Sequence, residues 1–511
     1  MGVSSSVRDH LVAYLASHRK LAESQAIELL AADRQPLLFC QQVLEVAGPE
    51  TPLITRELVE EVAERRGPRP GPIVRPESPT DGPAAPRRAA PPFQVLVQGF
   101  VAPPPHQDPL SAYGALFSDR YRRLSRLLTG RASLRGLRPI RELRGAEREA
   151  SIIGMVREVR ATPKQHHLIV TVEDETGTAE CLLPKDSPLS REPILPDEVV
   201  GVSLALPKDR GRLPRVEGWE RPDVPIGRVP GRADRPVRAI FLSDLHIGSK
   251  SFLADAWGRL VDFLGGKGPA PDLARSIEVA VVAGDLVDGI GIYPRQEQDL
   301  AIADVVEQYQ ELGRRLRELP PTMTIAVVPG NHDAVSPAEP QPALASGIAA
   351  SLPPNVRSLG NPSTFAVHGV VVEAYHGRGF DDLIPAIPGA SYGRPTDVMK
   401  RMLAMRHLAP IYGGRTPLAP LPRDGLVIDP VPDVLVTGHA HTYGVDRYRD
   451  VLLLNVSTWQ GETEYQKMRN ITAVPARATI VDLNRPGAAD GIVHLDASGP
   501  SLRLSGGGLP A

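Results

Sequence analysis

The sequence has very little cysteine: Cys40 and Cys181 are the only two in 511 residues. Two thiols exclude a disulfide framework and a zinc cluster built from thiolates, so we interpret them as small buried apolar residues in a reducing compartment. No apolar run approaches the ~18 residues needed to cross a bilayer, and the N-terminus lacks the apolar segment of a secretory signal. The sequence therefore predicts a soluble, cytoplasmic protein with no membrane partner.

The sequence also lacks an excess of either charge, with 58 basic and 60 acidic residues and a net charge of -2. This balance excludes a polycation that binds nucleic acid by overall charge, so any such contact must use a local patch. The densest basic segment has ten arginines between residues 120 and 148. Two interpretations of it stay open: a surface that contacts phosphates, or a solvated helix face and loop.

Composition divides the rest of the chain into parts and predicts a multidomain α/β protein. Residues 1–65 carry apolar side chains at helical spacing and are expected to form a small helical module. Residues 66–92 are rich in proline and are expected to be an extended linker, and residues 93–148 a helical, arginine-rich connector. Residues 149–226 contain several short strands, which predicts an OB-type β-barrel. This barrel segment has no aromatic side chain before residue 215, which favours a structural or subunit-contact role over base stacking.

Residues 236–484 alternate short β-branched runs with helical segments, which is typical of an α/β domain with strands buried on both faces. Five of these runs end in residues that bind metal ions: VRAIFLS leads into DLH, IEVAVVA into GD, MTIAVV into GNHD, VVVEAY into HG, and DVLVTG into GHAH. Loops at the carboxyl ends of such strands converge on one crevice. Residues 485–511, rich in Gly, Pro and Ser, are expected to be a flexible tail.

The candidate metal ligands are Asp244, His246, Asp285, Asn331, His376, His439 and His441. Four imidazoles, two carboxylates and one amide oxygen suit manganese, iron or zinc better than calcium. These are too many ligands for one ion, but they suit two ions that share a carboxylate. Two ions about 3.5–4 Å apart can clamp a phosphate, activate water and neutralise the developing charge. The predicted reaction class is therefore the hydrolysis of a phosphoester.

Some neighbouring residues are harder to assign. We prefer His376 to His368 as a ligand because His376 ends its apolar run, whereas His368 stands at a strand start. Asp381 and Asp382 are interpreted either as charges that support the site or as solvent-exposed residues. His407 stands alone in the sequence and is expected at the surface.

The five motifs, in this order, resemble those of the calcineurin-like metallophosphoesterase superfamily. The resemblance implies a four-layer α/β/β/α domain with two metal ions that share Asp285. One ion would be held by Asp244, His246, Asp285 and His441, and the other by Asp285, Asn331, His376 and His439. The resemblance also implies two catalytic residues: His332, which contacts the scissile phosphate and protonates the leaving oxygen, and Asp333, which orients the His332 ring.

The barrel that precedes this domain resembles the same part of the small subunits of archaeal family D DNA polymerases. Four short segments resemble the sequences of the same family: ASIIGMVREVRATPK, FLSDLHIGSKSF, YHGRGFDDLI and NVSTWQGETEYQKMRN. This resemblance implies a 3′–5′ exonuclease that trims single-stranded or mismatched primer 3′ ends at the nucleoid, in complex with a large catalytic polymerase subunit. The expected cofactors are two divalent ions, with Mn²⁺ preferred and Zn²⁺, Fe²⁺ or Mg²⁺ as alternatives. Two other hypotheses stay open: a stand-alone metallophosphatase or nucleotidase, and a polymerase scaffold subunit without catalysis.

Overall fold

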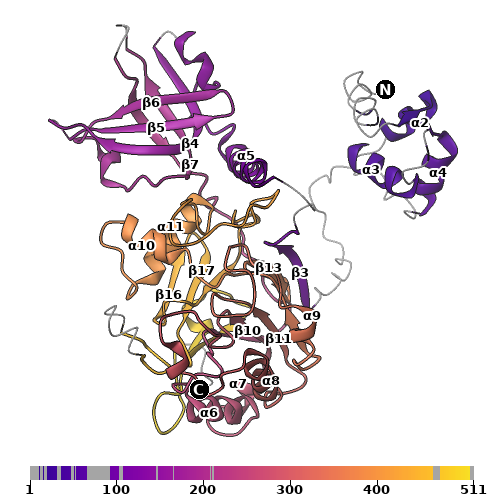
Figure 1. Cartoon of the computed structure of the whole chain (residues 1–511), viewed down its shortest axis with the longest axis vertical. Coiled ribbons are helices and arrows are strands. Elements are labelled where there is room, and N and C mark those ends of the chain that lie inside the picture. The colour runs from indigo at the N-terminus through magenta and orange to yellow at the C-terminus, as the bar shows by residue number, and fades with distance from the viewer. Residues whose placement is uncertain are drawn as a thin grey trace, which may run out of the picture. The chain divides into compact units, whose positions relative to one another are not determined.

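The computed structural model describes residues 11, 15, 20–31, 36–47, 51, 53–65, 92–102, 108–145, 148–164, 166–207, 209, 212–463 and 472–506. The chain forms two compact units, Met1–Arg87 and Arg88–Ala511 (Figure 1). In the described part, no helix has the length and apolar content that crossing a membrane requires. The predicted linker over residues 66–92 lies outside the described residues except for its last one.

The first unit has a small apolar core. Its elements are β1 (Leu21–Ala22), α2 (Ser24–Ala31), α3 (Pro36–Ala47), β2 (Leu53–Ile54) and α4 (Arg56–Arg65). Leu30, Val43 and Val59 are buried where the three helices meet, as their helical spacing predicts. Leu21 departs from the helical prediction, because it pairs with Leu53 in a two-residue parallel strand and is 72% exposed.

In the second unit, five strands close into a barrel with the order β4-β5-β6-β8-β7. The strands are β4 (Glu149–Ala161), β5 (Leu168–Asp174), β6 (Gly177–Leu183), β7 (Val199–Ala205) and β8 (Arg215–Glu220), with 3-10 turns η1 (Ile140–Gly145) and η2 (Pro188–Arg191) beside them. Ile152, Val170 and Val202 fill the interior, because alternate residues of a strand point to the same face.

The rest of the second unit, here called the two-sheet domain, is built on two β-sheets (Figure 1). One sheet has the order β12-β11-β10-β9-β18-β19-β20. Its strands are β9 (Arg238–Leu242), β10 (Ile277–Ala283), β11 (Thr324–Val328), β12 (Val356–Ser358), β18 (Arg477–Asp482), β19 (Ile492–Asp496) and β20 (Arg503–Ser505). The other has the order β16-β17-β15-β14-β13-β3. Its strands are β3 (Phe93–Gln98), β13 (Ser363–Val367), β14 (Val370–Ala374), β15 (Val434–Thr437), β16 (Tyr443–Tyr448) and β17 (Val451–Val456).

Three apolar clusters show that the two-sheet domain has four layers. Trp257 and Leu312 of the outer helices pack on β9 to β11 of the first sheet, Phe241 and Phe365 pack between the sheets, and Met402 packs on the second sheet. The helices are α6 (Ala254–Leu264), α7 (Pro271–Arg275), α8 (Val305–Leu316), α9 (Ser346–Ala349), α10 (Phe380–Ala386) and α11 (Pro395–Met405), with 3-10 turns η3 (Gln296–Gln298) and η4 (Ala489–Gly491). The α/β/β/α arrangement therefore matches the layers expected from the sequence.

Two segments were assigned wrongly from the sequence. Residues 93–98, expected within a helical connector, form β3, which pairs antiparallel with β13 at the sheet edge. Residues 485–506, expected in a flexible tail, contribute β19 and β20, and Val493 and Leu495 are buried against the helices. Both segments are short and lie next to proline- or glycine-rich stretches. Strand β3 forms because the distant β13 offers an open edge, whereas β19 adds to its neighbour β18 and β20 adds to β19. The last five residues, 507–511, lie outside the described part.

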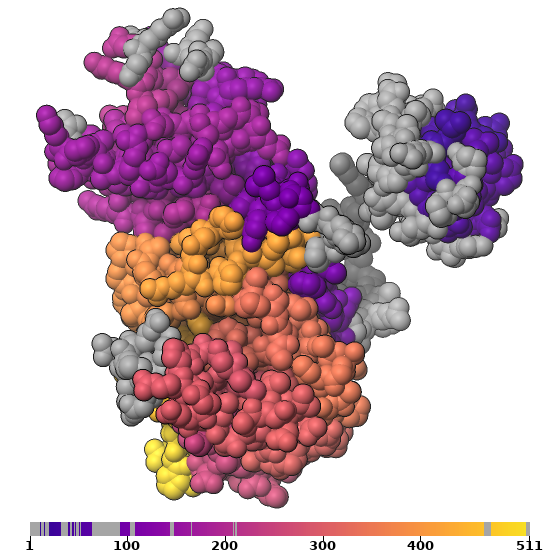
Figure 2. Space-filling view, in the orientation of Figure 1, coloured from indigo at the N-terminus to yellow at the C-terminus, as the bar shows by residue number. Residues whose placement is uncertain are grey.

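Helix α5 (Pro109–Leu128) joins the barrel to the two-sheet domain. Asp108 caps its N-terminus by accepting a bond from Ser111 N at 2.9 Å. Its Arg120 is completely buried: Nε donates to Asp424 Oδ2 at 2.7 Å, and Nη1 donates to Pro410 O at 2.6 Å. In Figure 2, this helix (purple) lies against the orange loops that carry these partners. One member of the arginine-rich segment is thus a structural cation and not a phosphate contact.

His407 was expected at the surface, and this prediction is wrong. Its side chain is buried, and its Nε2 lies 3.0 Å from Asp424 Oδ2, the oxygen that also accepts from Arg120. Burial lowers the pKa of His407 to about 4, with the charge of Arg120 acting in the same direction. Burial opposes ionisation of Asp424, but Arg120 and His407 hold its pKa well below the usual range. The junction therefore depends on a buried ion pair with one neutral imidazole.

We predict that Asp424→Asn destabilises the chain by about 3–5 kcal/mol, because it leaves the Arg120 cation buried without its counter-charge. Thermal or urea unfolding of the full chain measures this loss. Glu175→Gln is the matched control, since Glu175 pairs with the exposed Arg122 of the same helix at 2.8 Å. That control is expected to cost less than about 1 kcal/mol. Equal losses for the two variants would contradict a special role for the buried pair.

Candidate metal centre

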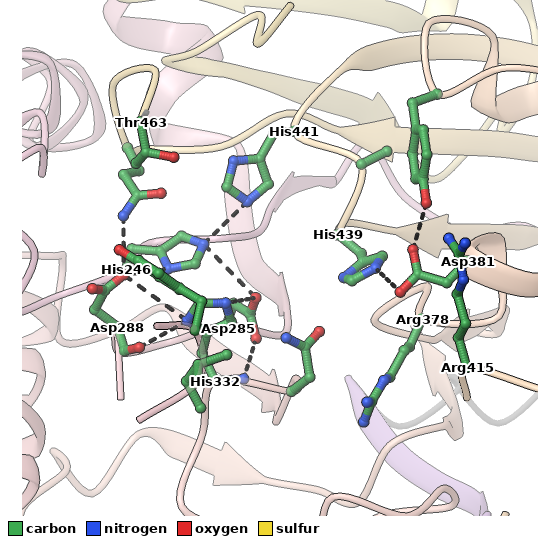
Figure 3. Close-up of a pocket in the computed structure, with 16 residues that line it drawn as sticks. His246, Asp285, Asp288, His332, Arg378, Asp381, Arg415, His439, His441 and Thr463 are labelled. Atoms are coloured by element: carbon green, nitrogen blue, oxygen red, sulfur yellow. Dashed lines mark hydrogen bonds and ion pairs between the residues drawn. The ribbon is translucent and has the colours of Figure 1, made fainter. Parts of the chain in front are cut away.

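The predicted ligands lie on the loops that follow five strands of the two-sheet domain, and Figure 3 labels four of them, His246, Asp285, His439 and His441. In chain order they are Asp244 and His246 after β9, Asp285 after β10, Asn331 after β11, His376 after β14, and His439 and His441 after β15. Strands β9, β10 and β11 run parallel, and so do β14 and β15. Parallel strands end at the same edge of their sheet, so the five loops gather above one end of the sandwich.

Asp244, His246 and His441 form one group of candidate ligand atoms. His441 Nε2 lies 3.2 Å from Asp244 Oδ1 and 3.1 Å from His246 Nε2. Asp285 Oδ2 lies 3.7 Å from His246 Nε2. All four side chains are buried. Two imidazole nitrogens that face each other beside two buried carboxylates suit a shared cation, which satisfies lone pairs that would otherwise repel.

Asp285, His376 and His439 form a second group. His376 Nε2 lies 3.3 Å from Asp285 Oδ2 and 3.1 Å from Asn331 Oδ1. The rings of His376 and His439 meet edge to face with their centroids 5.1 Å apart. Asp285 thus stands within reach of both groups. The donor set of each group, nitrogen with carboxylate or amide oxygen, fits a divalent transition metal.

Five ligand residues have a left-handed backbone that non-glycine residues rarely adopt. The φ angles are 51° at Asp244, 48° at His246, 47° at Asp285, 64° at His439 and 54° at His441. Each such residue costs of order 1 kcal/mol. The left-handed turn directs the chain sharply away from the strand and returns the side chain toward the site. This concentration of strain on the candidate ligands indicates a functional site.

The glycines of the motifs leave room for the ligand side chains. A Cβ on Gly330 would lie 2.2 Å from Asp285 Oδ1, one on Gly284 2.3 Å from His376 Nδ1, and one on Gly438 2.2 Å from Asp244 Oδ2. Even alanine would therefore displace a ligand at each position.

Hydrogen bonds outside the two groups fix the orientation of the imidazoles. His246 Nδ1 lies 2.9 Å from Asp288 Oδ1, and His376 Nδ1 lies 3.1 Å from Ala283 O, which leaves Nε2 of each ring for an ion. His439 Nε2 lies 3.2 Å from Asp381 Oδ2, so this carboxylate supports the site and is not simply solvent-exposed. Asp288 was missed in the sequence. Its position three residues after Asp285, within GDLVDG, was the available indication.

The role predicted for Asp333, orienting the His332 ring, is wrong. Asp333 Oδ2 accepts from Gly330 N at 2.8 Å and from Leu286 N at 3.1 Å, while Oδ1 accepts from Tyr309 at 2.8 Å. Its carboxylate therefore ties the loop after β11 to the loop after β10. Although Asp333 and His332 are neighbours in the sequence, their side chains do not lie side by side. His332 is oriented instead by the backbone: its Nδ1 lies 2.7 Å from Asp288 O.

The ionisation of the site shows its need for positive charge. Burial disfavours the charged form of His246, but the hydrogen bonds that its ring donates to Asp244 and Asp288 outweigh this effect and raise its pKa to about 10. Burial likewise opposes protonation of His376, and Asp285 raises its pKa to about 9. Burial also opposes ionisation of Asp285, but the charges of His376 and His332 hold its pKa well below the usual range. Divalent cations would supply this positive charge and displace the imidazole protons.

A cavity of about 310 Å³ opens above the two groups. His332 Nε2 lies 3.9 Å from Asp285 Oδ2, and its side chain remains 15% exposed in the cavity wall. Other lining residues are Ile292, Tyr293, Arg378, Tyr392, Arg415, Gln460 and Thr463. His368 lies elsewhere, with its Nε2 3.2 Å from Glu278 Oε2 at the turn between β13 and β14. The cavity is therefore lined by acidic, imidazole and basic groups together.

Two face-to-face sheets between helices, with His, Asp and Asn side chains on the loops after β9, β10, β11, β14 and β15, define a metallophosphoesterase-like fold. A family model for the B subunits of DNA polymerases alpha and epsilon matches residues 239–445. The DNA polymerase II small subunit of Archaeoglobus fulgidus is 44% identical over 376 residues, which are 73% of this chain and 74% of that protein. The chain belongs to this family, the small subunits of archaeal family D DNA polymerases, which confirms the family expected from the sequence.

The DNA polymerase II small subunit of Methanothermobacter thermautotrophicus is 42% identical over 379 residues, which cover 73% of this chain and 77% of that protein. Among solved structures, Vps29 of Entamoeba histolytica, complexed with Zn²⁺, matches with a TM-score of 0.29 and 15% identity. That match covers 53% of this chain and 98% of the other.

Proposed function

We propose that this chain carries a dinuclear metal-dependent 3′–5′ exonuclease that trims single-stranded or mismatched primer ends. The observation that carries this proposal is the complete ligand set: all seven predicted side chains are present on loops at the same end of the two sheets. A subunit that serves only as a scaffold has no need for buried, strained ligands. Membership of a polymerase family favours DNA ends over small phosphomonoesters as the substrate.

The residues divide into two sets around the shared Asp285. Asp244, His246 and His441 would hold one ion with it, and Asn331, His376 and His439 the other. When bound, two divalent ions polarise a phosphodiester and lower the pKa of water. The mixture of nitrogen and oxygen donors leads us to propose Mn²⁺, with Zn²⁺, Fe²⁺ or Mg²⁺ as alternatives.

His332 is the residue placed to act directly on the substrate. Its Nδ1–H donates to Asp288 O, so a second proton on the ring resides on Nε2, on the side of Asp285 and the cavity. Burial lowers the pKa of His332. The negative charge of a bound phosphate opposes this effect and favours the protonated ring. Protonated His332 would then donate to the phosphate or to the leaving 3′-oxygen.

The other parts of the chain suit a subunit of a larger enzyme. We propose that the barrel is of the OB type, since five strands, paired mostly antiparallel, close into a barrel with the order β4-β5-β6-β8-β7. We also propose a large catalytic polymerase subunit as the partner, because the relatives are named as small subunits. Three-prime trimming of a mismatched primer by the full chain, with and without the co-expressed large subunit, tests the function. Turnover of mononucleotides alone would instead favour a stand-alone phosphatase.

We predict that the full chain, stripped with EDTA, binds two Mn²⁺ ions, because two ligand sets meet at Asp285. Titration calorimetry or elemental analysis after gel filtration measures the stoichiometry. His441→Ala is expected to retain one ion, since His441 belongs to the first group alone. A wild-type chain that binds one ion, or a His441→Ala chain that binds none, would contradict two separable sites.

A further inference from the structure

Two arginines line the metal cavity and have no role in the ligand sets: Arg378 and Arg415. Arg378 follows His376 in the segment YHGRGFDDL, and Arg415 lies on the loop between α11 and β15. Figure 3 shows both beside Asp381 and His439, whereas Asp288 and Thr463 lie at the other side of the view. The cavity therefore has a basic side that the metal chemistry does not explain.

Within the described residues, neither guanidinium forms an ion pair with a carboxylate. Arg378 Nη1 donates to Pro337 O at 2.7 Å, which anchors one end of its guanidinium and leaves its other nitrogens for a ligand. Arg415 is exposed. Asp381, which lies beside these arginines in Figure 3, is already engaged by His439 at 3.2 Å. Two cations without a matching anion are suited to an anionic ligand.

The backbone around these arginines is tied into one unit. Asp382 Oδ1 accepts from Arg415 N at 2.6 Å, and Oδ2 accepts from Thr416 N at 2.9 Å. Thr416 Oγ1 in turn donates to Arg378 O at 3.0 Å. A Cβ on Gly414 would lie 2.3 Å from Asp382 Oδ1, so this loop needs glycine to approach the carboxylate. Asp382 thus has a structural task of its own: it fixes the two arginines next to each other.

We propose that Arg378 and Arg415 bind the phosphate on the 5′ side of the scissile phosphate of a DNA strand, an inference that rests on the proposed nuclease function. The scissile phosphate itself belongs at the two ligand groups. A 3′-terminal nucleoside carries no further phosphate, so the only other anion that a 3′ end brings near this cavity is the next phosphodiester upstream. The arginines are therefore a subsite that recognises a polynucleotide and not a phosphomonoester.

The opposite wall agrees with this direction of the strand. Ile292 lines the cavity on the loop that starts at Asp288, and Ile292 N donates to Gln296 Oε1 at 2.9 Å. Gln296 Nε2 donates back to Asp288 O at 2.8 Å, so the loop is fixed next to His332, whose ring contacts the same carbonyl. Ile292 is 39% exposed. An apolar side chain on this wall suits the terminal nucleoside, while the basic wall receives the charged backbone.

The test compares two diesters with the full chain in Mn²⁺. One is a single-stranded oligodeoxynucleotide, and the other is bis(4-nitrophenyl) phosphate, which has no second phosphate. We expect the double variant Arg378→Gln/Arg415→Gln to lose about 10–100-fold in kcat/KM on the oligonucleotide, or about 1.4–2.8 kcal/mol in total, because both charged contacts to the second phosphate are removed. On the small diester, its kcat/KM should stay within about twofold of the wild type. Arg503→Gln on β20 removes the same charge away from the cavity and should change neither.

A substrate change identifies which phosphate the arginines bind. A neutral methylphosphonate at the second linkage from the 3′ end should lower wild-type trimming by the same factor and leave the double variant unaffected. Equal losses on both diesters, unchanged trimming of the oligonucleotide, or equal effects of the methylphosphonate on both proteins would overturn the subsite. If the wild type hydrolyses neither diester, the nuclease function itself fails. Wild-type trimming without any arginine effect rejects the subsite alone.

Discussion

Asp285→Asn is expected to lower the rate of 3′-end trimming by at least about a thousandfold, the range seen when a central catalytic group is removed. The Asp285 carboxylate lies close to both ligand groups, with Oδ2 3.3 Å from His376 Nε2 and 3.7 Å from His246 Nε2. Asparagine has the same shape and keeps the oxygen that accepts from His332 N, but it loses the negative charge that two cations would share. Both ions should therefore bind more weakly.

The measurement is trimming of a labelled mismatched primer at several Mn²⁺ concentrations, together with the number of bound ions. Asp262→Asn is the matched control, because Asp262 lies exposed on α6, where it pairs with Lys267 at 3.1 Å. Its activity should equal that of the wild type. A folded Asp285→Asn chain that binds two ions and trims at the wild-type rate would remove the dinuclear nuclease hypothesis.

The candidate site could be predicted from the sequence because its chemistry lies at strand ends. A β-branched run followed by DLH or GNHD places polar residues where a buried strand must stop, and the parallel arrangement of β9, β10 and β11 then brings them together. What each imidazole contacts on its other side was not accessible in this way. Asp288 supports His246 across 42 positions of sequence, and that contact depends on the fold of two separate loops.

The errors have a common physical origin in long-range pairing. Strand β3 has three exposed residues in its centre and no clear alternation, so only its ladder with β13 makes it a strand. His407 resembled a surface histidine because the sequence gives no sign of the buried Arg120 that shares its carboxylate from about 300 positions away. Asp333 was assigned to its neighbour His332, whereas its carboxylate accepts from Gly330 of its own loop, from Leu286 of the loop after β10 and from Tyr309 of α8. Local sequence patterns identify candidate functional residues, but the topology of the fold determines which other residues they contact.

His332→Ala is expected to lower the rate of trimming by about 10²–10³-fold while both metal ions stay bound. The ring is not needed for either ligand group, since Asp244, His246, Asp285, His376, His439 and His441 account for both. Its Nε2 nevertheless lies 3.9 Å from Asp285 Oδ2, and the ring lines the cavity in which a substrate phosphate would be held. The loss should therefore appear in kcat, with ion stoichiometry and melting temperature unchanged.

A second substrate separates proton donation by His332 from simple packing. With a 4-nitrophenyl leaving group, whose oxygen needs no proton at neutral pH, His332→Ala should recover most of the lost activity relative to an alkoxide leaving group, such as the 3′-oxygen of the penultimate nucleotide of a DNA strand. His332→Gln keeps a hydrogen-bond donor of similar size without an acidic proton, so it should behave like the alanine variant on DNA. If both variants lose the same factor on both leaving groups, His332 acts by binding the phosphate and not by protonating the leaving oxygen. If either variant loses its metal ions, His332 belongs to the ligand set, and the assignment of metal binding to Asp285 and proton donation to His332 is wrong.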